Sequence, residues 1–70
     1  MRLTVNGQER ECDAKTLAEL WQRETEGLDG TSPRGFAISH NGIVVRRTAW
    51  PTTRLADGDT VEIIRAISGG

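Results

Sequence analysis

Residue types on which protein chemistry commonly depends are scarce in this sequence. It holds one cysteine, Cys12, and one histidine, His40, in 70 residues. A lone cysteine excludes an intrachain disulfide and a cysteine-based metal cluster, and His40 has no potential co-ligand near it in sequence. Asp57-Gly58-Asp59 is typical of a turn rather than a metal site. We expect no catalytic residue and no metal ligand, with Cys12 a reduced thiol facing inward and His40 structural.

Long apolar runs and phosphate-binding motifs are missing as well. The longest apolar runs are only a few residues, and Met1-Arg2 is followed by alternation rather than by an apolar signal-peptide segment. This pattern predicts a cytoplasmic protein with no membrane association. Neither glycine-rich phosphate-binding motif occurs, so any ATP chemistry has to come from another protein. We expect the chain to bind no cofactor of its own.

Strong charge of one sign is also missing. The net charge of −1 gives no indication of nucleic-acid binding. The charge is nevertheless uneven, because residues 9–29 are mostly acidic and the arginines gather after residue 30. Such asymmetry could steer a partner, but a scattered, solvated surface is the simpler explanation and the one we favour. The later arginines are Arg34, Arg46, Arg47, Arg54 and Arg65, against Asp57, Asp59 and Glu62.

A chain of this length makes one domain, which buries only about 60% of the surface of its unfolded chain. Asn6-Gly7 and Asn41-Gly42 each supply the two positive-φ positions of a tight hairpin turn. Thr16-Leu17-Ala18-Glu19 is a capping box that starts a helix. The expected elements are strands near 1–5 and 8–13, a helix over 17–25, strands over 36–40 and 43–45, a short helical turn near 50–53, and a last strand over 60–66.

This order predicts an α+β domain with one main helix packed across one face of a mixed sheet of four to five strands. The first and last strands would both lie centrally, which is the arrangement of a β-grasp. We divide the chain into a folded domain, residues 1–66, and a flexible tail, residues 67–70. Val61 and Ile63 should face inward, leaving Glu62 and Ile64 on the outer face.

The tail ends in Gly69-Gly70. Without Cβ atoms, two glycines can thread a narrow channel and allow close approach to the terminal carbonyl. A frayed, glycine-rich terminus is also common. The residues alone leave open whether the tail is a reactive end or a frayed one.

From Phe36 to Gly70 the sequence resembles the thiamine-biosynthesis sulfur carrier family (ThiS). Two features depart from the family pattern: Arg46 stands where proline is common, and the loop from Gly27 to Gly35 is longer. The opening Met1 to Gly7 and the helix start agree in placement. The stretches that carry the likeness are Asn41-Gly42-Ile43-Val44-Val45-Arg46-Arg47-Thr48-Ala49-Trp50, Leu55-Ala56-Asp57-Gly58-Asp59-Thr60-Val61-Glu62-Ile63-Ile64, and Gly69-Gly70.

The resemblance implies a ubiquitin-like β-grasp carrier that acts as a co-substrate and is not itself an enzyme. An activating enzyme would use Mg-ATP to adenylate the Gly70 carboxylate, and a donor such as a cysteine desulfurase system would supply sulfur. Thiazole synthase would then consume the thiocarboxylate to build the thiazole of thiamine. Gly69, Ser68 and Ile67 would contact these partners, and Ile64 would be part of a docking patch or a plain surface residue.

The resemblance also implies a protein that is monomeric when free and binds neither nucleic acid nor membrane. Other functions stay open beside it: the small subunit of molybdopterin synthase, a sulfur carrier for another pathway, and a non-catalytic β-grasp binding or modifier domain. A β-grasp ferredoxin is disfavoured because one cysteine cannot hold an iron–sulfur cluster.

Overall fold

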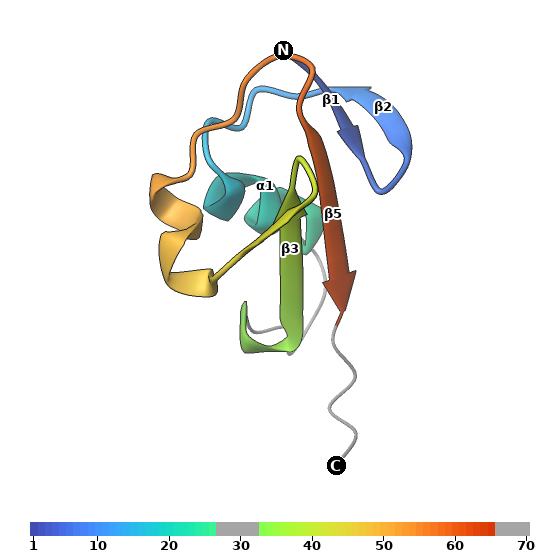
Figure 1. Ribbon diagram of the computed structural model, residues 1–70. Coiled ribbons are helices and arrows are strands. Elements are labelled where there is room, and N and C mark those ends of the chain that lie inside the picture. Colours follow the sequence, from blue (N-terminus) through green and yellow to red (C-terminus); the bar gives the residue numbers. More distant parts are fainter. Residues whose placement is uncertain (27–32, 66–70) are drawn as a thin grey trace.

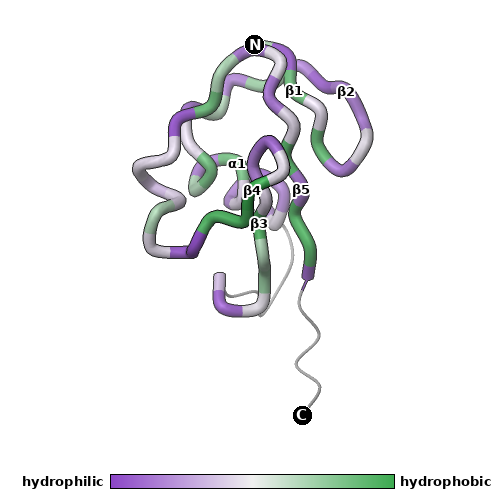
Figure 2. The backbone as a smooth tube through the Cα atoms, viewed as in Figure 1, coloured by the Kyte–Doolittle hydropathy of each residue, from purple (hydrophilic) through white to green (hydrophobic). Residues whose placement is uncertain are grey.

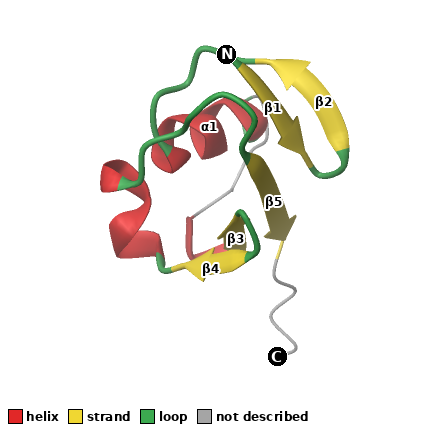
Figure 3. Ribbon diagram, turned by 45° about the horizontal axis from the view of Figure 1, so that its top comes forward, coloured by secondary structure: helices red, strands yellow, loops and turns green. Residues whose placement is uncertain are grey.

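Five strands form one mixed sheet, and the main helix packs against one of its faces (Figures 1 and 3). The computed structural model describes residues 1–26 and 33–65, so the expectations for 27–32 and for Ala66 lie outside the described residues. The elements are β1 (Arg2–Val5), β2 (Gln8–Glu11), α1 (Leu17–Glu24), η1 (Pro33–Gly35), β3 (Phe36–His40), β4 (Ile43–Val45), η2 (Arg47–Thr52) and β5 (Thr60–Arg65). This order confirms the predicted α+β β-grasp. The differences are in detail: β2 ends two residues earlier than expected, η2 starts three residues earlier, and the short helix η1 lies at the end of a segment expected to be a loop.

The two Asn-Gly turns take the predicted conformation. Asn6 and Gly7 have φ of 51° and 82°, and Asn41 and Gly42 have φ of 50° and 85°. Left-handed backbone at both central positions is what a two-residue hairpin needs for its strands to keep their natural twist. The turns therefore set the antiparallel pairing of β1 with β2 and of β3 with β4.

β5 lies in the middle of the sheet, in the order β2-β1-β5-β3-β4. It pairs in parallel with β1 through Val5 and Val61, and antiparallel with β3 along its length, up to Phe36 opposite Arg65. The side chain of Asn6 accepts a hydrogen bond from the Ile63 N–H at 2.8 Å, and the side chain of Asn41 accepts one from the Thr60 N–H at 2.9 Å. Both hairpin turns thus also hold the central strand.

Helix α1 begins at the predicted cap. The Thr16 hydroxyl accepts a hydrogen bond from the Glu19 N–H at 3.2 Å, which satisfies one of the free backbone donors of the first turn. Leu17 and Leu20 are buried on the face toward the sheet. At the other end the Thr25 hydroxyl donates to the Trp21 carbonyl at 2.8 Å. The helix therefore presents one apolar face to the strands, as its periodicity predicts.

The core lies between α1, η2 and the inner face of the sheet. The Trp50 indole N–H donates to the Val45 carbonyl at 2.9 Å and fixes η2 beside β4, while Trp21 contacts both Trp50 and Phe36 through its ring. Within the described part of the chain, no helix has the length and apolarity needed to cross a bilayer. The buried apolar residues are Leu3, Val5, Ala14, Leu17, Leu20, Ile38, Trp50, Leu55 and Val61.

Replacing Ile38 tests this arrangement. Ile38 is fully buried, so Ile38→Ala should lower the free energy of unfolding by about 2–5 kcal/mol, and Ile38→Val by about 0.5–1.5 kcal/mol. Ile64 leaves 55% of its surface exposed, so Ile64→Ala should change it by less than about 0.5 kcal/mol. Urea unfolding of the three variants measures these differences. Equal losses in Ile38→Ala and Ile64→Ala would contradict the assignment of the two sheet faces.

Candidate functional site

The residues predicted to react and to enter partner enzymes, Ile67, Ser68, Gly69 and Gly70, lie outside the described residues. What the structure describes is the strand that leads to them. β5 is held in the centre of the sheet, and its last residue, Arg65, is still paired with Phe36 of β3. The described part of β5 therefore ends beside β3, whereas β1 pairs with β5 only at Thr60 and Val61.

Exposed apolar residues gather on the outer face of the sheet, next to the end of β5. Figure 2 shows hydrophobic residues along β4 and near the end of β5. Ile64 is 55% exposed and pairs with Ala37 of β3, while Val44 of β4 is 74% exposed and pairs with the next outward residue of β3, Ser39. We call Ala37, Val44 and Ile64 the sheet-face patch. Glu62 follows on the same face, which confirms the predicted alternation along β5.

Sequence reasoning identified Ile64 but missed Val44 and Ala37. Val44 stands in an unbroken run, Ile43-Val44-Val45, that carries no alternation to separate an inner face from an outer one. Its position became clear only from the pairing of β4 with β3. Ile43 is about as exposed as Val44, but it pairs with His40 and so lies on the other face, at the edge of the sheet.

His40 and the Asp57-Gly58-Asp59 segment are structural, as predicted. Gly58 has a φ of 89°, the positive value that favours glycine in a turn. His40 Nε2 lies 2.7 Å from Asp59 Oδ2, and the same carboxylate accepts hydrogen bonds from the Ala56 N–H and the Asn41 side chain. These contacts tie the β3–β4 hairpin to the turn before β5.

The Asp59 carboxyl is more acidic than usual because of these partners. Partial burial on its own would raise its pKa, but hydrogen bonds from His40, the Ala56 N–H and Asn41 together outweigh burial and lower the pKa below its ordinary value. A carboxyl with a lowered pKa in the folded state favours folding most when it is ionised.

Cys12 faces inward, as expected, and is a free thiol. It is half-buried because β2 is an edge strand, and its Sγ accepts a hydrogen bond from the Ala14 N–H at 3.4 Å. Cys12 lines an open groove of about 410 Å³ between β2 and α1. Arg10 with Glu24 and Arg23 with Asp13 form ion pairs between the groove's two sides. Across the residues that the structure describes, no three His, Cys, Asp or Glu side chains group closely enough to hold a metal ion.

Comparison with known proteins places this geometry in a family. The model of the ThiS family matches residues 3–70. The crystal structure of a thiamine biosynthesis protein (ThiS) from Geobacter metallireducens is 32% identical and covers all of both chains with a TM-score of 0.76. A solution structure of a thiamine biosynthesis protein from the same organism has a TM-score of 0.70 at 32% identity, covering all of this chain and 88% of that one.

A curated relative is longer. The chain is 31% identical over 70 residues to a protein from Paramagnetospirillum magneticum named thiazole synthase. The match takes in all of this chain and 20% of that protein, so the chain spans about a fifth of the length of this relative.

Titration of Asp59 generates a prediction about acid stability. Because the folded-state pKa is lowered, the stabilisation by Asp59 is fully present above its unfolded pKa of about 3.9 and is lost as the pH falls through the folded value. The difference in unfolding free energy between the wild type and Asp59→Asn should therefore be largest near neutral pH and shrink below about pH 4. Urea unfolding across this range measures it. A difference that stays constant with pH would contradict the assigned hydrogen bonds.

Proposed function

The chain belongs to the ThiS family, and we propose that it carries sulfur in thiamine biosynthesis as a thiocarboxylate formed on Gly70. The observation that carries the proposal is the match of the family model to residues 3–70, together with a β-grasp sheet whose central strand, β5, ends five residues before Gly70. In this role the chain would act as a co-substrate for partner enzymes, and its small size and membership of the ThiS family support this role.

The chemistry requires activation, because a carboxylate is a poor electrophile. In the proposed first step a Gly70 carboxylate oxygen attacks the α-phosphate of ATP, and pyrophosphate leaves. The partner activating enzyme holds the Mg-ATP, since this sequence has no phosphate-binding motif. The resulting acyl-adenylate has an electrophilic carbon and a good leaving group.

Sulfur enters in the second step. The terminal sulfur of a persulfide on a donor protein attacks the activated carbon and AMP leaves, which gives an acyl disulfide. A thiol then cleaves the sulfur–sulfur bond, releasing the Gly70 thiocarboxylate and leaving a disulfide, so that the two electrons are accounted for. The sulfide equivalent stays covalently bound until an acceptor enzyme takes it.

Thiazole synthase is the acceptor enzyme that we propose. The support is the similarity of the whole chain to one fifth of a protein named thiazole synthase, together with the family's thiamine role. Glycines at 69 and 70 suit this transfer, because a chain without Cβ atoms fits a narrow channel and lets the carbonyl carbon approach a nucleophile closely. Ser68 and Ile67 would contact the walls of the same channels.

The sheet-face patch is the proposed docking surface for the activating enzyme. Ile64 and Val44 are large apolar side chains left in solvent, and Ile64 is one residue from the end of β5. An enzyme that covers this patch holds the base of the tail and so limits where the tail can reach. Exposed apolar residues gathered on one face are typical of such protein contacts.

Charging of Gly70 is the direct test. The protein incubated with its activating enzyme, ATP and a persulfide donor should gain the mass difference between one sulfur and one oxygen atom, located at Gly70 by intact and fragment mass spectrometry. Deleting Gly70 should abolish the gain and leave the unfolding curve unchanged, because the described core ends at Val61. No gain with an active partner, or an adduct on a lysine of another protein, would argue for a different function.

Docking has a separate test. Ile64→Lys should raise the KM of the activating enzyme for the carrier by about tenfold or more, because a charge would be buried in an apolar contact. Thr60→Lys is the matched control, as Thr60 is exposed on the same face of β5 at the far end from the tail. An equal rise in both variants would show that added charge, and not the sheet-face patch, is responsible.

A further inference from the structure

A second groove lies on the other side of the molecule, between α1 and η2. It has a volume of about 220 Å³, and its lining includes Trp21 and Trp50, the prolines Pro33 and Pro51, and Arg47. The two tryptophan rings are 6.1 Å apart between centroids and make the wall apolar. Tryptophan and arginine are the residues most enriched in the energetic centres of protein interfaces.

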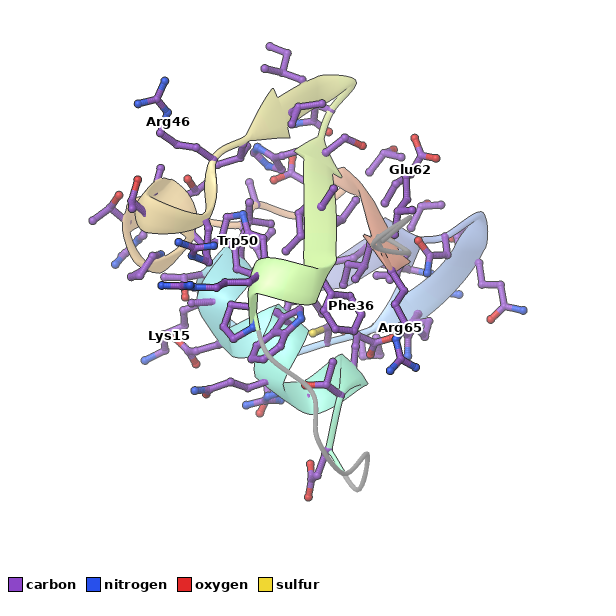
Figure 4. All side chains as sticks on the ribbon, turned by 90° about the horizontal axis from the view of Figure 1, so that it is seen from below. Lys15, Phe36, Arg46, Trp50, Glu62 and Arg65 are labelled. Carbon is purple, nitrogen blue, oxygen red and sulfur yellow. The ribbon has the colours of Figure 1, made fainter. Side chains whose placement is uncertain are left out.

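Cations that form no ion pair with another described residue flank η2, which makes one side of this groove. Arg46 precedes η2, Arg47 is its first residue, and Arg54 follows it. Arg54 forms a bridge with Thr16, which places Lys15 beside it, before α1. Figure 4 shows Lys15, Arg46 and Trp50 on the same side of the molecule, away from Arg65 and Glu62.

The ion pairs of the described residues all lie away from the α1–η2 groove. Arg2, Arg10 and Arg23 form ion pairs with acidic side chains. These acids belong to β2, to α1 and to the segment between these two elements. None of Lys15, Arg46, Arg47 and Arg54 takes part in an ion pair with another described residue, which leaves the α1–η2 side with an excess of positive charge. Glu19 of α1 has no ion pair with another described residue, and its negative charge partly offsets this positive excess.

We propose that the α1–η2 groove is a second docking surface, for an acidic segment of a partner protein that inserts one apolar side chain against Trp21 and Trp50. Its carboxylates would pair with Arg47 and the neighbouring cations at the rim. Charge complementarity of this kind selects partners and speeds their association. A protein segment fits better than a nucleic acid, because the groove is apolar and the chain as a whole carries a net charge of −1.

The two docking surfaces can be occupied together. α1 covers one face of the sheet, and the sheet-face patch lies on the opposite face (Figure 3). A protein bound in the α1–η2 groove would therefore leave Ile64 and the end of β5 free for the enzyme that acts on the tail. The groove would let the carrier be held by one protein while another modifies it.

Tryptophan signals offer a specific test that needs no sulfur chemistry, so its outcome is independent of the proposed function. Trp21 and Trp50 are the two tryptophans of the sequence, and both line the groove. A short synthetic peptide with one leucine flanked by glutamates should shift both indole N–H resonances at low salt, and added salt should weaken its binding. The same peptide with serine in place of leucine should bind more weakly.

Charge reversals locate the site. Arg47→Glu and Lys15→Glu should each weaken binding of the leucine peptide by about tenfold, since each places a carboxylate against the peptide's own. Arg65→Glu changes the net charge equally, lies at the end of β5, and should leave the affinity unchanged. Amide spectra of each variant check that the fold is kept.

Three outcomes would overturn the proposal. One is the absence of indole shifts with the leucine peptide. Another is an equal loss of affinity in Arg65→Glu, which would indicate unspecific attraction. The third is tighter binding by an oligothymidine probe than by the peptide, which would assign the surface to nucleic acid instead.

Discussion

The central position of β5 is the constraint on which the rest of the structure depends. The hairpins β1–β2 and β3–β4 do not pair with each other, so β5 joins them into one sheet. Val61 is fully buried between them. The turn of each hairpin reaches β5 through an asparagine side chain, Asn6 to the Ile63 N–H and Asn41 to the Thr60 N–H. Without β5, each hairpin would leave an open edge and an uncovered apolar face.

The same strand links stability to function. Its inner residues close the core, its outer residue Ile64 contributes to the sheet-face patch, and its last residue leads to the tail. Because the strand is held along its length by β3, its last residue, Arg65, has a defined place relative to the patch. An enzyme bound to the patch, as we propose, would therefore be held next to the end of β5.

Charged residues are distributed unevenly over the surface of the molecule. The acids of the first half are largely neutralised by neighbouring arginines on the β2 and α1 side, whereas the cations around η2 keep their charge available. Two surfaces of different character result. One is apolar and lies beside the tail, and the other is cationic around an aromatic groove. Two proteins that bind different surfaces need not compete, which would suit the carrier role that we propose.

Local signals were sufficient for the order and type of the elements. Asn-Gly turns require positive φ, the Thr16 cap satisfies a free helix donor, and alternation separates Val61 from Ile64, so each could be predicted from its own neighbourhood. The likeness to ThiS could also be recognised in the sequence. The assignment of the reactive group to Gly70 came from that likeness and stays a prediction, because Gly70 lies outside the described residues. Tertiary structure alone decided which distant residues meet. Strand register puts Val44 on the same sheet face as Ile64 and brings His40 to Asp59. Packing of the segment before α1 against the segment after η2 brings Lys15 near the arginines that flank η2. No local pattern encodes these contacts, because each joins residues whose relative placement is set by strand pairing or by the packing of segments that are distant in the sequence.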